Sequence, residues 1–139
     1  MFATFFAVAA LVLAASEPAK DPDAIHRVPT AWRPILKKMV SALVRKDYAF
    51  ADCSPAVKSP PKTDSRFMRQ YIDGYGETLV DIPETVWKKA ECGWYDTHWE
   101  IMVDLWTAES GESDMVLMVH VKELKDGSYR FLPRSLYVP

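Results

Sequence analysis

Three apolar segments near the C-terminus decide the fold: WEIMVDLW at residues 99–106, MVLMVHVK at 115–122 and YRFLPRSLYV at 129–138. They are rich in the β-branched and aromatic residues that are typical of strands. Two stretches with turn-forming residues, SGES at 110–113 and KDGS at 125–128, separate them. Because strands joined by short turns usually pair in chain order, the three segments predict an antiparallel β-meander.

Alternation of residue types gives the first of these strands two different faces. Its odd positions, from Trp99 to Leu105, are all apolar, and an apolar sheet face needs a covering layer. A two-residue turn at 126–127 predicts the register of the last two strands, with Glu123 opposite Arg130 and Leu117 opposite Leu136.

Two helices are predicted before these strands. Apolar residues recur at helical spacing from Trp32 to Val44, and a second helix is predicted over 66–75, where Gly76 favours its termination. A strand is predicted over 78–82. The sequence therefore predicts an α+β domain in which N-terminal helices pack on a four-stranded, mostly antiparallel sheet that ends in a β-meander.

The N-terminus has the composition of an export signal. Residues 1–16 contain no charged side chain, and they end in the small residues Ala14, Ala15 and Ser16. The apolar run is shorter than the about 20 residues that span a bilayer. We expect a signal peptide at 1–16, a flexible lead-in at 17–29 and a single domain at 30–139, in a periplasmic or secreted protein without stable membrane insertion after cleavage. A retained membrane anchor and a wrong start site are the alternatives, because no Lys or Arg precedes the apolar run.

Composition and motifs exclude several functional classes. The 139 residues include 17 basic and 19 acidic ones, for a formal net charge of -2 without a basic tract, so no nucleic-acid partner is expected. No nucleophile elbow, HExxH motif or glycine-rich phosphate loop occurs, and we expect no cofactor. The three histidines lie in dissimilar segments, so no metal site is expected either.

Cys53 and Cys92 are the two cysteines of the chain. An oxidising compartment would tend to join them in a disulfide if the fold brings them together. Two separate buried thiols are the alternative.

The even-numbered face of the meander is the candidate site. A loop at 110–112 would place Glu100 opposite Lys122 and Met102 opposite His120, with Asp104 diagonal to His120. A carboxylate near a histidine orients the ring or shifts its pKa for general base catalysis, so Asp104 and His120 are the candidate catalytic pair. The alternative is that they are cross-strand partners on a solvated face.

Acidic and aromatic residues on the same face suggest binding. The carboxylates at 109, 112 and 114 are expected at one hairpin tip, either merely solvated or as a patch for a basic partner. The tryptophans at 94 and 106 are expected on the polar face or its rim, where they mark an interface unless the second helix covers them. The candidate binding residues are Trp94, Trp106, Glu100, Lys122, Glu109, Glu112 and Asp114.

Four stretches carry a resemblance to a known family: ALVRKDY at 42–48, YGETLVDIPETVW at 75–87, DLWTAESGESDMVL at 104–117 and YVP at 137–139. On these motifs residues 30–139 resemble a bacterial domain of unknown function, and that resemblance implies no activity. The order of elements is also similar to the cystatin-like and nuclear-transport-factor-2-like folds, in which a curved sheet wraps a helix. Those folds host enzymes, binding modules and toxin-immunity proteins alike.

The sequence favours a non-catalytic module that binds a protein or small ligand, as an immunity-like or periplasmic accessory protein. Two alternatives stay open. One is a small enzyme that uses Asp104 and His120 in a cone-shaped pocket, and the other is a purely structural envelope protein.

Overall fold

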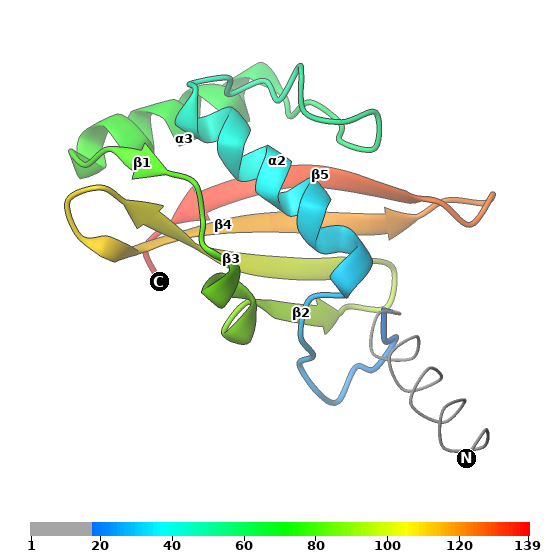
Figure 1. Ribbon diagram of the computed structural model, residues 1–139. Coiled ribbons are helices and arrows are strands. Elements are labelled where there is room, and N and C mark those ends of the chain that lie inside the picture. Colours follow the sequence, from blue (N-terminus) through cyan, green and yellow to red (C-terminus); the bar gives the residue numbers. More distant parts are fainter. Residues whose placement is uncertain (1–17) are drawn as a thin grey trace, which may run out of the picture.

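The computed structural model describes residues 18–139 and has the predicted α+β class, with two α-helices and an antiparallel sheet (Figure 1). The sheet has five strands rather than the four that the sequence predicts. The elements are η1 (Thr30–Trp32), α2 (Arg33–Val44), α3 (Lys62–Tyr75), β1 (Leu79–Val80), η2 (Glu84–Lys88), β2 (Glu91–Trp94), β3 (Trp99–Thr107), β4 (Gly111–Glu123) and β5 (Tyr129–Tyr137).

The strand that the sequence misses is β2. It pairs with the first half of β3, from Trp99 to Met102, while β1 pairs with the end of β3 at Trp106 and Thr107. Both short strands therefore share one edge of β3, and β4 and β5 follow on its other side. The four residues of β2 include a glycine, so the segment has too little alternation to predict a strand.

The register of β4 and β5 differs from the prediction in one half of the pair. Glu123 lies opposite Tyr129, because the connecting loop has three residues, 125–127, and Gly127 adopts a left-handed φ of 86°. A bulge between Met118 and Val119 then shifts the pairing by one residue. Leu117 consequently lies opposite Leu136, as predicted.

The register of β3 and β4 is also corrected. The connecting loop spans residues 108–110, and the pairing has a bulge on β3 between Asp104 and Trp106. Glu100 therefore lies opposite His120 and Met102 opposite Met118, two residues away from the predicted pairing. Asp104 lies opposite Val116, so the predicted diagonal contact with His120 is wrong.

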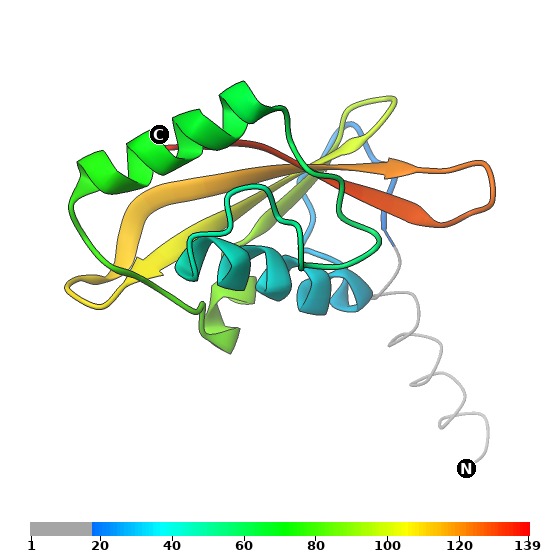
Figure 2. The same ribbon diagram turned by 90° about the horizontal axis from the view of Figure 1, so that it is seen from above.

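Helix α2 covers the apolar face of the sheet, and Figures 1 and 2 show it lying across the strands. Trp32, at the end of η1, packs edge-on against the rings of Trp99, Tyr129 and Phe131, at centroid distances of 5.3, 5.1 and 5.7 Å. The buried residues of the helix itself are Leu36, Met39, Val40, Ala42 and Leu43.

Helix α3 packs beside β5 (Figure 2). It begins at Lys62, earlier than predicted, and ends at Tyr75, as predicted, before Gly76, whose φ of 79° favours glycine. Met68 and Ile72 are its buried residues. Two of its tyrosine hydroxyls accept backbone N–H groups, Tyr71 from Val138 and Tyr75 from Asp114, and so attach the helix to the sheet.

The segment 18–29, assigned to the lead-in, lies against the sheet. His26 and Cys92 form a β-bridge with N···O distances of 2.9 and 2.8 Å, and the indole N–H of Trp99 donates to the Ala19 carbonyl at 2.9 Å. Val28 is 1% exposed. The predicted signal peptide at 1–16 lies outside the described residues. Among residues 18–139, no helix is both long and apolar enough to span a membrane.

Both cysteines are buried and free, so the structure has two separate thiols in place of a disulfide. Burial raises the pKa of Cys92 to about 12. A thiol with so high a pKa carries almost no thiolate at neutral pH and is a poor nucleophile.

Candidate functional site

The even-numbered face of the meander is open. Along β3 every odd position is buried and every even position from Glu100 to Trp106 is half-buried. The polar groups of this open face form two clusters. The carboxylate groove consists of Lys89, Asp104, Trp106 and Glu112, and the histidine cluster consists of His98, Glu100 and His120.

The carboxylate groove forms where η2 meets the β3–β4 hairpin. The bulge after Asp104 and the pairing of Trp106 with Glu112 bring these three side chains to one end of the open face. Lys89, directly after η2, donates to both Glu112 oxygens at 3.1 and 3.2 Å. Lys89, Asp104 and Glu112 line a hollow of about 620 Å³. An adjoining hollow of about 510 Å³ extends past Asp104 towards Met102.

Asp104 is the unusual group of this groove. Partial burial raises the pKa of its carboxyl group, and the neighbouring Glu112 charge raises it further. Lys89 offsets only part of this effect, because its ammonium group pairs with Glu112. In the described part of the chain, Lys89 is thus the one cation that forms an ion pair with these two adjacent carboxylates, while Lys88 and Arg27 line the hollows around Asp104 without an ion pair to either. Two neighbouring carboxylates attract a further positive charge.

The three predicted acidic residues do not converge at the hairpin tip. Glu109 accepts hydrogen bonds from the backbone N–H and hydroxyl of Thr78, and these bonds lower the pKa of Glu109. It thus ties the hairpin loop to the start of β1. Glu112 pairs with Lys89, whereas Asp114 is exposed and lines the hollow of about 620 Å³ beside it.

The other predicted binding residues divide between the two faces. Trp106 lies in the carboxylate groove. Trp94 pairs with Trp99 and packs on its ring at 4.6 Å, so it belongs to the helix-covered side. Lys122 is exposed and lies opposite Arg130 on β5, and on the β3 side it is His120, not Lys122, that lies opposite Glu100.

The histidine cluster lies at the opposite end of the open face. Glu100 Oε2 is 3.2 Å from His98 Nε2 and 3.7 Å from His120 Nε2. The two imidazole rings stack at 4.3 Å between centroids. Burial lowers the pKa of His120, and the nearby His98 lowers it further.

Sequence reasoning missed two of these residues. Strand periodicity places His98 on the same face as Glu100, two residues away, but the predicted register puts Lys122 rather than His120 beside Glu100, so the sequence does not predict the cluster. The sequence contains no comparable signal for Lys89, because Lys89 comes close to Glu112 only through the position of η2 in the folded structure.

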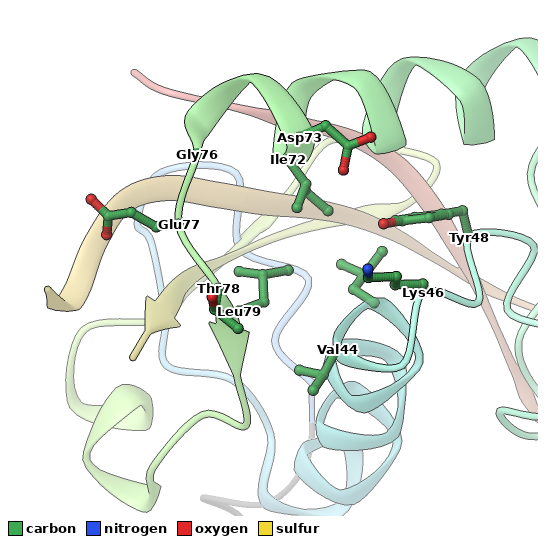
Figure 3. A pocket seen from close by; sticks show the side chains of 10 residues that line it. Val44, Lys46, Tyr48, Ile72, Asp73, Gly76, Glu77, Thr78 and Leu79 are labelled. Atoms are coloured by element: carbon green, nitrogen blue, oxygen red, sulfur yellow. The ribbon is translucent and has the colours of Figure 1, made fainter. Parts of the chain in front are cut away.

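A separate pocket of about 240 Å³ lies between the end of α2, α3 and β1 (Figure 3). Leu79 and Val44 are part of its apolar lining, and Lys46 and Asp73 are part of its polar lining. Burial and the Asp73 charge raise the pKa of Tyr48 at its rim. None of the candidate site residues lines this pocket.

Comparison with known proteins defines the family but not an activity. No curated protein and no solved structure matches the chain. A family model described as a domain of unknown function, DUF7668, matches residues 40–139, which include both clusters of the open face. The expected resemblance to a domain of unknown function is thereby confirmed, and the chain belongs to the DUF7668 family.

Proposed function

We propose that this protein is a non-catalytic binding module that takes a basic segment of a partner protein in the carboxylate groove. The observation that carries the proposal is the pair of adjacent carboxylates, Asp104 and Glu112, with Lys89 as the one cation paired to them among residues 18–139. A Lys or Arg side chain of a partner would pair with Asp104. Charge-assisted hydrogen bonds to partly buried carboxylates are among the stronger polar contacts in interfaces.

Trp106 adds an aromatic surface to this site. It lines a third hollow, of about 210 Å³, together with Asp104 and Glu112, and it is half-buried in the free protein. A cation beside a tryptophan ring gains about 0.5 to 2 kcal/mol, depending on how far it is desolvated. The groove thus combines the two groups that recognise a basic side chain, a carboxylate and an aromatic face.

The geometry gives less support to the alternative of an enzyme with an Asp104–His120 pair. Val116 occupies the position opposite Asp104, and His120 lies four residues farther along β4, a separation of about 13 Å along a strand. A general base has to lie within hydrogen-bond reach of the group that orients it. The hollows around Asp104 are also open to solvent, which suits a bound segment.

NMR titration with model peptides tests the proposal. Two peptides of equal length in a Gly-Ser background, one containing Lys and the other Glu, are added to the isotope-labelled protein. We expect the Lys peptide to shift the indole N–H signal of Trp106 and the Glu peptide to leave it unchanged. Asp104→Asn should weaken binding of the Lys peptide about tenfold, because a charge-assisted hydrogen bond is lost.

Glu123→Gln is the matched control, since it removes one negative charge at the far end of β4, where Glu123 pairs with Lys20. It should leave the affinity for the Lys peptide unchanged. The proposal is wrong if both peptides shift Trp106 equally, or if Glu123→Gln weakens binding as much as Asp104→Asn does.

We further propose that the module acts after export from the cytoplasm, as a periplasmic or secreted protein. The uncharged, apolar composition of residues 1–16 supports this location. Mass spectrometry of the intact protein from an extracytoplasmic fraction should give a chain that begins at Glu17. A full-length chain confined to the cytoplasm would refute the proposed location and leave the groove proposal untouched.

A further inference from the structure

We infer that His98, Glu100 and His120 form a binding site for a divalent transition-metal ion of the zinc type. One ligand atom from each of the three residues lies within 4.8 Å of the other two. Two imidazoles and one carboxylate are a ligand set that zinc, copper, nickel and iron accept in proteins. The site goes beyond the proposed function, because it shares no residue with the carboxylate groove.

The spacing of the ligand atoms suits a single ion. Zinc binds imidazole nitrogen and carboxylate oxygen at about 2.0 to 2.2 Å, so neighbouring ligand atoms of a tetrahedral site are about 3.3 to 3.5 Å apart. The distances from Glu100 Oε2 to His98 Nε2 and His120 Nε2 are 3.2 and 3.7 Å. Small side-chain rotations would therefore bring the three groups around one ion.

The sheet holds these side chains in place. Glu100 on β3 lies directly opposite His120 on β4, and His98 precedes Glu100 by two residues on the same face. The His98 ring lies between the rings of His120, at 4.3 Å, and Tyr95, at 6.2 Å. Ligands fixed by strand backbones and ring stacking lose little freedom when they bind an ion.

A second contact can support the tautomer of His98 that binds a metal through Nε2. The Thr97 hydroxyl oxygen is 3.0 Å from His98 Nδ1 and can accept its proton. Without an ion, Nε2–H of His98 donates to Glu100 at 3.2 Å; an ion bound at Nε2 would take the place of this proton, and Nδ1–H would then donate to Thr97. Hydrogen bonds of this kind to the distal ring nitrogen orient metal-binding histidines and raise their basicity.

Burial distinguishes this cluster from ordinary surface charges. The three side chains are 19%, 21% and 20% exposed, so water reaches them only in part. An ion there would gain from the Glu100 charge with less screening than at the surface. Three protein ligands would also leave one position of a tetrahedral ion open towards solvent.

Zinc titration of the chelator-treated full chain, purified without a histidine tag, tests the inference. Calorimetry should show one Zn²⁺ bound per chain. Glu100→Gln and His120→Asn should each weaken binding at least about tenfold, because each removes one direct ligand. Nitrogen NMR of the histidine rings should show Zn²⁺ shifting Nε2 of His98 and His120 in the unmodified protein.

His26→Ala is the matched control. His26 Nε2 also contacts a carboxylate, Asp21 at 2.9 Å, but it belongs to no group of three ligands among the described residues. This variant should bind Zn²⁺ as the unmodified protein does. Absence of Zn²⁺ binding, or binding that persists in His120→Asn, would overturn the inference. If a variant unfolds, the ring-nitrogen signals of the unmodified protein decide, and unshifted His98 and His120 would likewise refute the site.

Discussion

Asp104 is a residue whose position reduces stability and serves the proposed binding. Its carboxyl group is partly buried beside Glu112, and both burial and that neighbouring charge raise its pKa. The folded state consequently binds a proton at Asp104 more tightly than the unfolded chain does. The free energy of unfolding therefore falls as the pH rises through the interval between the two pKa values. Functional sites often retain such groups at a cost in stability.

We predict that Asp104→Asn stabilises the protein at pH 7 by about 0.5 kcal/mol, because an amide removes the repulsion between two carboxylates. The gain should vanish at low pH, where Asp104 is protonated in the folded and unfolded states alike. Urea unfolding at several pH values measures both effects. Asp114→Asn, a change at an exposed carboxylate lining the same groove, should have little effect at any pH. A pH-independent gain in Asp104→Asn would contradict this account.

For single residues, the sequence predicts the face of the sheet on which a side chain lies better than it predicts the neighbours of that side chain. It indicated the open face correctly, because alternation along one strand is a local property. It placed Lys122 opposite Glu100, however, and the structure places His120 there. A register error of two residues keeps every side chain on its predicted face but changes its neighbours. The histidine cluster was missed for this reason.

The elements that determine the register are loops and bulges. Both hairpin loops, 108–110 and 125–127, have three residues, and each pair of strands contains a bulge. In each loop or directly after it a glycine has positive φ, Gly111 at 71° and Gly127 at 86°. Glycine permits these conformations but does not specify loop length, so the sequence predicts the three strands of the meander but not their exact pairing.

Helix α3 depends on a narrow apolar stripe. Met68 is fully buried, whereas its neighbour Phe67 is 54% exposed. We predict that Met68→Ala lowers the free energy of unfolding by about 2 to 4 kcal/mol, because it removes a buried side chain and leaves a cavity between helix and sheet. Phe67→Ala should change it by less than about 0.5 kcal/mol. Urea unfolding compares the two variants directly.

This comparison separates packing from helix propensity. Both substitutions introduce alanine, the best helix former, at adjacent positions of the same helix. Equal stability of the two variants would mean that α3 does not pack on the sheet through Met68.

The whole molecule is larger than the segment that the family model matches. The family model begins at residue 40, yet Trp32 and Leu36, both nearly fully buried, precede that point. The two clusters of the open face lie at opposite ends of one sheet, so the core under both depends on the same helix α2. Residues before the matched segment thus support the site without contributing a side chain to either cluster.

The segment 18–29, which lies outside the helices and named strands, also stabilises the fold. We predict that the free energy of unfolding of a chain shortened to residues 30–139 is about 2 to 4 kcal/mol lower than that of a chain of residues 18–139. The shortened chain loses the burial of Val28, and the indole N–H of Trp99 loses its acceptor at Ala19. Lys20→Ala in the longer chain removes only an exposed ion pair with Glu123 and should change stability by less than about 0.5 kcal/mol. Urea unfolding of the three proteins measures these differences. Equal midpoints for the two chain lengths would show that the segment is a flexible lead-in, since its contacts with the sheet would then contribute nothing to folding.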